Sequence, residues 1–260
     1  VGNGISLIIF SGIVAELPSA LAATLELGRT GAISALVIVG ILVMVAAVIT
    51  FIVFVERAQR RLIVQYPKRQ MGNRMYGGES SHLPLKINTP GVIPPIFASA
   101  LLLMPVTVAG FSAGQGPEWM TMITAHLGRG QPVFLILYAS LIIFFAFFYT
   151  AVVFNPTDTA DNLKKYGGFI PGIRPGKNTA DYLDYVLTRL TVVGASYLTL
   201  ISLLPEMLIS KFAVPFYFGG TSLLIVVTVT MDTVAQVQSH LLAHQYEGLI
   251  KKSRLRGRQR

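Results

Sequence analysis

Six long apolar stretches constrain this chain more than any other feature of its sequence. They cover residues 4–25, 33–55, 91–111, 133–154, 186–209 and 215–237. A helix rises about 1.5 Å per residue, so about 20 apolar residues cross the hydrocarbon core of a bilayer. The stretches lack the alternation of apolar and polar residues that is typical of membrane β-strands. The sequence therefore predicts an all-α, polytopic membrane helical bundle with six spanning helices.

The composition agrees with a lipid environment and excludes several kinds of site. Hydrophobic residues make up 53% of the chain and charged residues 13%, whereas soluble domains carry about 25% charged residues. The chain has no cysteine, which excludes disulfides, thiolate metal sites and a cysteine nucleophile. It also has no glycine-rich phosphate loop, no Ser/His/Asp set and no paired carboxylates in a span. We therefore expect no enzyme.

The basic residues predict the orientation in the membrane. Lys and Arg gather in segments 56–89 and 155–190 and in the tail 240–260, while the alternate loops hold only Arg29, Arg129 and Lys211. Basic residues collect on the cytoplasmic side. Both ends of the chain are therefore predicted to be cytoplasmic, which six spans require, with 56–89 and 155–185 as cytoplasmic loops and 240–260 as a cytoplasmic tail.

The two cytoplasmic loops are long for helix connections, which commonly have about 2–8 residues. Both mix apolar, aromatic, glycine and proline residues, so we expect ordered loops with a strand or hairpin in each. The first also carries a basic cluster. Two roles are consistent with it: an anchor at anionic lipid and a docking surface that binds phosphate groups. The cluster comprises Arg57, Arg60, Arg61, Lys68 and Arg69.

A single arginine in the second loop has a different setting. Arg174 is framed by Gly172, Pro175 and Gly176, and such residues restrict the local backbone to a turn. A lone charge on a rigid turn favours a presented contact over a membrane anchor.

Ionisable side chains within the spans are few. Glu16 and Asp232 lie late in the first and last spans, where we expect interfacial or structural roles. His240 and His244 share a helix face, but Leu241 stands where a zincin motif has glutamate. Because further ligands are missing, we expect no metal and no cofactor.

Two adjacent prolines, Pro94 and Pro95, lie early in the third stretch. A proline inside a helix removes an N–H donor and bends the helix. Both an ordinary membrane-helix proline and a helix kinked around a pore or gate are consistent with this position.

Several motifs in order along the chain resemble the SecY family, the central subunits of the bacterial Sec translocon. The matching stretches are GNGISLIIFSGIVAELP at 2–18, FVERAQRRLIVQYPKRQ at 54–70, HLPLKINTPGVIPPIFAS at 82–99, GGFIPGIRPGKNT at 167–179, YLDYVLTRLT at 182–191 and VPFYFGGTSLLIVV at 214–227. The resemblance implies that the six spans correspond to the fifth to tenth membrane helices of the family. The first four helices and the plug are then missing, and the chain opens at Val1 with no signal peptide evident.

The resemblance implies a protein-conducting channel subunit for Sec-dependent protein translocation across, and insertion into, the bacterial cytoplasmic (inner) membrane. The implied partners are SecE, SecG, the SecA motor ATPase, the ribosome, signal peptides and translocating polypeptides, membrane lipid and the missing N-terminal half. From the residues alone, a small-solute transporter and an inactive structural fragment stay open as alternatives.

The resemblance also assigns expected roles to particular residues. The pore ring would comprise Ile5, Ile9, Ile96 and Ile225, and Pro94 and Pro95 would form a kink at the lateral gate. Arg174 and the basic cluster would dock SecA or the ribosome.

Overall fold

The computed structural model describes residues 4–71, 74–76, 78, 80–111, 117–128, 130–212 and 220–257. Within these residues, six helices are long and apolar enough to cross a membrane, which confirms the predicted fold class. They are α1 (Gly4–Arg29), α2 (Ala35–Arg57), α3 (Ile93–Phe111), α5 (Pro132–Val153), α7 (Lys177–Phe212) and α8 (Gly220–Gly257).

The last two helices are longer than the sequence suggests. α7 begins at Lys177 rather than at residue 186, and α8 continues to Gly257, past the predicted end at 237. The first part of α7 is too polar to be recognised as a span, but its apolar residues recur on one helical face, where Ala180 and Leu183 are buried. Residues 215–219 of the last predicted span and 258–260 of the tail lie outside the described residues.

The chain forms two compact units. The first, here called the terminal unit, comprises Val1–Val43 and Ser222–Arg260, and the second, the central unit, comprises Met44–Thr221. The terminal unit therefore holds α1, the first part of α2 and almost all of α8. The central unit holds the end of α2 and every element from β1 to α7.

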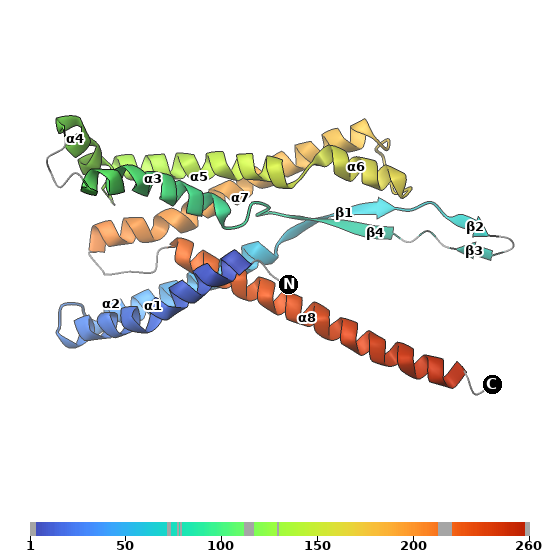
Figure 1. Ribbon diagram of the computed structural model, residues 1–260, viewed down its shortest axis with the longest axis horizontal. Helices are drawn as coiled ribbons and strands as arrows, with labels where there is room; N and C mark the ends of the chain where they lie inside the picture. The colour runs from blue at the N-terminus through green and yellow to red at the C-terminus, as the bar shows by residue number, and fades with distance from the viewer. Residues whose placement is uncertain are drawn as a thin grey trace. The chain divides into compact units, whose positions relative to one another are not determined.

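Three helices of the central unit, α3, α5 and α7, pack side by side (Figure 1). The buried residues of α5 recur every four positions and so lie on one face of the helix; they are Phe134, Tyr138, Ile142, Ala146 and Thr150. Ala98 of α3 and Ala146 are both completely buried, and small side chains of this kind let membrane helices approach closely.

The first long loop, residues 56–89, folds into a β-hairpin, as the sequence predicted. β1 (Gln59–Gln65) pairs antiparallel with β4 (Ser80–Lys86), and β2 (Arg69–Met71) pairs with β3 (Arg74–Tyr76) further out. Leu62 and Val64 of β1 are buried, while Ile63 between them is half exposed. Because buried and exposed residues alternate along the strand, one face of the hairpin is directed toward the rest of the central unit.

The second loop forms a helix instead of the predicted strand or hairpin. α6 (Pro156–Lys165) begins after Asn155, whose side chain accepts a hydrogen bond from the N–H of Thr157 at 3.1 Å. Extended pairing is limited to one antiparallel bridge between Gln65 and Phe169. Glycines with positive φ, at Gly167 (75°) and Gly172 (84°), turn the chain on both sides of the bridge and so prevent a longer strand.

A short helix not anticipated from the sequence, α4 (Glu118–His126), lies in the connection between α3 and α5. It contacts α3 and lies at the end of the central unit opposite the hairpin (Figure 1).

Candidate functional site

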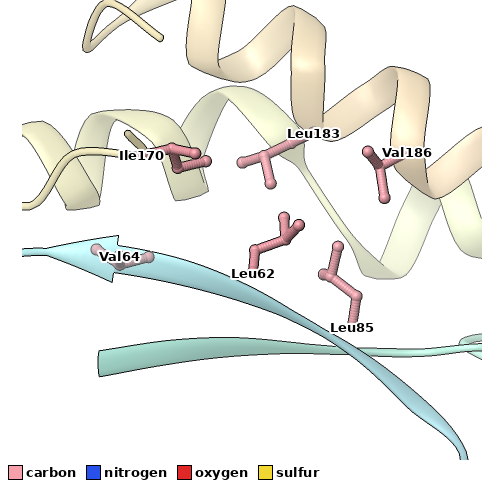
Figure 2. Packing of buried hydrophobic residues seen from close by; sticks show 6 residues of the cluster. All are labelled: Leu62, Val64, Leu85, Ile170, Leu183 and Val186. Carbon is pink, nitrogen blue, oxygen red and sulfur yellow. The ribbon is translucent and has the colours of Figure 1, made fainter. Parts of the chain in front are cut away.

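The two long loops, residues 56–89 and 155–185, share one hydrophobic core (Figure 2). The hairpin contributes Leu62, Val64 and Leu85, the second loop contributes Ile170, and the first turns of α7 contribute Leu183 and Val186. All six are at most 7% exposed. Burying an aliphatic side chain of this size stabilises a fold by about 1.5–3 kcal/mol relative to leaving it in water. The hairpin and the second loop therefore form a single small domain, here called the loop domain.

Backbone hydrogen bonds join the two loops as well. The N–H of Gln65 donates to the carbonyl of Phe169 at 2.9 Å, and the N–H of Phe169 donates back to Gln65 at 3.0 Å. Gly168 lies directly over Val64 and Tyr66, since a Cβ added there would come within 3.1 Å of either side chain. The loop domain thus fixes the chain leading to Arg174 against the strand that carries the basic cluster.

Arg174 is exposed on a well-fixed turn. The hydroxyl of Thr179 donates a hydrogen bond to the Arg174 carbonyl at 2.9 Å, and Thr179 is itself only 2% exposed. Ile173 packs against the core of the loop domain, and Gly176 turns the backbone with a φ of 107°. The backbone of Arg174 is therefore held on both sides while its side chain faces outward, as the surrounding glycines suggested.

The basic cluster lies on the same domain. Arg57 ends α2, Arg60 and Arg61 belong to β1, and Lys68 follows that strand; all four are exposed. Arg69 lies in β2, and its side chain falls outside the described part of the chain. The structure thus brings Arg174 and the arginines of β1, far apart in sequence, onto one domain, with Arg57 at the end of the helix that leads into it.

The four predicted pore residues are divided between the two units. Ile5 and Ile9 lie on α1 and Ile225 on α8, all in the terminal unit, whereas Ile96 lies on α3 in the central unit. Ile5 is 70% exposed and Ile225 is 7% exposed. The arrangement of the four as a ring stays a prediction.

The terminal unit contains a cavity of about 470 Å³ between α1 and α8. Ser6 and Leu7 line it from α1, and residues between Val229 and His244 line it from α8. His240 lies on this lining together with Asp232. Across the described residues, no group of three or more His, Asp and Glu side chains is placed to hold a metal ion.

Pro94 and Pro95 begin a helix and do not kink one. They are the second and third residues of α3 and are almost completely buried. A proline in the first helical turn removes no intrahelical hydrogen bond, because the first N–H groups of a helix have no partner there. The expected kink at these residues is therefore wrong, and the proline within α3 is Pro105.

A buried polar junction, which the sequence did not reveal, lies where the hairpin leads into α3. The side-chain amide of Asn88, 3% exposed, donates to a carboxylate oxygen of Glu56 at 2.6 Å and to the carbonyl of Gly91 at 3.3 Å. Gly194 of α7 lies against the carbonyl of Ile87. In the sequence, Asn88 is only a polar residue at the end of the first long loop, just before the third apolar stretch.

Comparisons with known proteins agree on one family. The family model described as SecY matches residues 1–234. Two relatives are named protein translocase subunit SecY: one from Rickettsia conorii is 56% identical over 98% of this chain and 59% of its own length. The other, from Escherichia coli K12, is 58% identical over 99% of this chain and 58% of its own length. The chain thus spans a little under three fifths of the curated relatives it matches.

Solved structures share the fold. A SecY structure concerned with how the plug domain stabilises the closed channel matches with a TM-score of 0.65 and 18% identity, over 92% of this chain and 60% of that one. A structure of a protein-conducting channel matches with a TM-score of 0.62 and 17% identity, over 92% and 59%. With the family model matching most of its length, this chain belongs to the SecY family.

Proposed function

We propose that the chain forms the C-terminal part of a protein-conducting channel, which translocates proteins across the cytoplasmic membrane and inserts them into it. The observation that carries the proposal is the SecY family match over residues 1–234, together with six helices able to span a membrane. Because the chain spans only 59% of its relatives' length, the other half of the channel would come from the N-terminal SecY part.

The channel itself would be passive. Isoleucines Ile5, Ile9, Ile96 and Ile225 would close it as an apolar ring, since a narrow apolar constriction excludes water and ions while its side chains can part for a polypeptide. The energy would come from the SecA motor ATPase or from the translating ribosome. SecE and SecG would be the small membrane partners, and signal peptides would leave the pore through a lateral gate beside α3 and α5.

The loop domain would be the docking surface of the channel. Its exposed arginines suit phosphate and carboxylate groups, because a guanidinium binds either one bidentately. The basic cluster would contact ribosomal RNA, whose backbone phosphates attract such a surface, and Arg174 would contact SecA. In this orientation, which the distribution of Lys and Arg supports, the loop domain and both ends of the chain are cytoplasmic.

A crosslinking experiment tests the function. The chain has no native cysteine, so Ile225→Cys provides a single reactive thiol. We would co-express this variant with the N-terminal part of a SecY relative and SecE, stall a secretory precursor that carries one cysteine, and oxidise the complex. A disulfide that forms only with an engaged precursor is the expected result.

Leu200→Cys is the matched control, because Leu200 is 57% exposed on the membrane-spanning part of α7 and is not a pore candidate. It should give no crosslink. If Ile225→Cys also gives none in an assembled complex with an engaged precursor, Ile225 does not line the polypeptide path. Equal crosslinking at both positions would likewise contradict the assignment.

A further inference from the structure

The short helix α4 exposes an apolar face that nothing in the described central unit covers. Trp119 is 60% exposed, Met122 66% and Ile123 38%. Residues three and four apart share a helix face, so these three side chains form one continuous patch. His126 extends the same face at the end of the helix.

The remaining residues of α4 show that this face is turned away from the described part of the central unit. Met120 and Thr124 are the half-buried residues of the helix, and α4 makes its main contacts with α3 among the described elements. Glu118, Thr121 and Ala125 occupy a third, exposed side that is polar or small. The helix thus has a packed side, a polar exposed side and an apolar exposed side.

The position of α4 places this apolar face at the edge of the membrane-spanning region. The connection that contains α4 runs from the end of α3 at Phe111 to the start of α5 at Pro132. Beyond α4, Gly130 lies against Ser210 of α7, since a Cβ added at Gly130 would come within 2.9 Å of the Ser210 Cβ. Ser210 precedes Lys211, the last residue of the apolar span of α7.

The helices before and after α4 also expose apolar residues at the ends nearest to it in the sequence. Val108 and Phe111 at the end of α3 are 54% and 87% exposed, and Ile136 in the first turns of α5 is 68% exposed. These residues belong to helices apolar enough to span a membrane, and apolar side chains exposed on such helices suit contact with lipid. The patch on α4 therefore lies next to a helix that exposes apolar residues of its own, since α4 contacts α3.

We propose that α4 is an interfacial helix, which lies in the phospholipid headgroup region on the side of the membrane away from the loop domain. Trp119, Met122 and Ile123 point into lipid, and Thr121 points to water. Tryptophan prefers this depth because its ring is apolar and its indole N–H can still reach a hydrogen-bond acceptor. The docked helix fixes the depth at which α3 ends and α5 begins. The proposal requires only that the chain spans a membrane and does not depend on the channel function.

Trp119 is the only tryptophan of the chain, which gives a direct test. We would reconstitute the full chain in phosphatidylcholine vesicles, either plain or brominated at a defined depth on the acyl chains, and record tryptophan emission. Shallow bromines should remove about half of the emission or more, and bromines near the bilayer centre should remove less, because an interfacial helix lies near the boundary of headgroups and acyl chains.

The double variant Trp119→Phe, Thr121→Trp is the matched control, since it moves the single fluorophore to the polar side of the same helix. The emission maximum of this variant should lie at a longer wavelength than that of Trp119, and brominated lipid should quench it less. Equal emission of Trp119 in plain and brominated vesicles would overturn the proposal. A blue-shifted but unquenched emission would overturn it too, because protein and not lipid would then cover the face.

A second measurement in intact cells does not depend on reconstitution. Single cysteines at Met122 and Thr121 would be labelled with a membrane-impermeant maleimide. Met122→Cys should react about tenfold more slowly than Thr121→Cys. Lipid around the thiol keeps out the water-soluble reagent and disfavours the thiolate, which is the form that reacts. Equal labelling rates at both positions would show that the apolar face lies in water.

Discussion

At the scale of single residues, Gly194 shows how closely the loop domain approaches the membrane helices. A Cβ added there would lie 2.6 Å from the carbonyl oxygen of Ile87. Gly194→Ala should therefore destabilise the protein by about 1–3 kcal/mol, although alanine is favoured over glycine in a helix by about 1 kcal/mol. The midpoint of thermal unfolding in detergent, followed by circular dichroism, measures this.

Gly110→Ala on α3 is the control for that substitution, because an added Cβ there has nothing within 4 Å. Its unfolding midpoint should stay the same or rise. If Gly194→Ala behaves in the same way, α7 and the segment at Ile87 are further apart than the structure places them.

Arg174 allows a charge reversal that separates docking from folding. Its side chain is exposed while its backbone is held by the Thr179 hydroxyl, so Arg174→Glu should change the free energy of unfolding by no more than about 0.5 kcal/mol. SecA-driven transport into vesicles should fall about tenfold or more, because one contact between oppositely charged groups becomes a repulsion. The assay compares transport rates at equal amounts of assembled complex.

Lys177→Glu provides the matched charge reversal. Lys177 is the first residue of α7 and is exposed, and an acidic residue is favourable at a helix N-terminus. This variant should transport at close to the native rate. Normal transport by Arg174→Glu would contradict the docking role proposed for Arg174. An equal loss of transport in both variants would mean that transport depends on the net charge of this surface and not on Arg174 itself.

At the scale of elements, the loop domain depends on one small core. Leu183 has no exposed surface and lies among residues from the hairpin, the second loop and α7. Leu183→Ala should cost about 2–5 kcal/mol, through lost burial and the cavity that remains. Because this core joins the hairpin to α7, the loss should appear as faster amide exchange and faster proteolysis in β1 and β4.

Leu200→Ala is the control on the same helix, since Leu200 is 57% exposed. It should leave proteolysis of the hairpin unchanged. Hairpin protection that survives Leu183→Ala would mean that the backbone bridge between Gln65 and Phe169, and not the side-chain core, holds the two loops together.

Elements that depend on local composition were predictable from the sequence, and those that depend on distant contacts were not. The six spans follow from apolar runs, and the rigid turn at Arg174 follows from Gly172 and Gly176. The bridge from Gln65 to Phe169 joins residues far apart in sequence, so no local pattern indicates it. Pro94 and Pro95 were misinterpreted for a related reason: their effect depends on where α3 begins, and helix ends are poorly marked in continuous apolar sequence.

At the scale of the whole molecule, the membrane helices differ in how much of their apolar surface the chain itself covers. The apolar windows of α1 and α2 are each 6% buried within the chain, whereas that of α7 is 39% buried. Since the chain spans about 59% of its relatives, we expect the N-terminal SecY part to cover α1 and the first part of α2. The α3, α5 and α7 bundle already has its internal partners.

Amide hydrogen exchange tests this difference, because protection rises with the free energy needed to open a segment locally. Co-purification with the N-terminal part of a SecY relative should slow exchange in α1 by about tenfold, or about 1.4 kcal/mol of added local stability. Exchange around Ala146 in α5 should stay nearly the same and serves as the internal control. Equal slowing in both helices would indicate general stabilisation by the added chain, and no slowing in α1 would mean that lipid alone covers its exposed face.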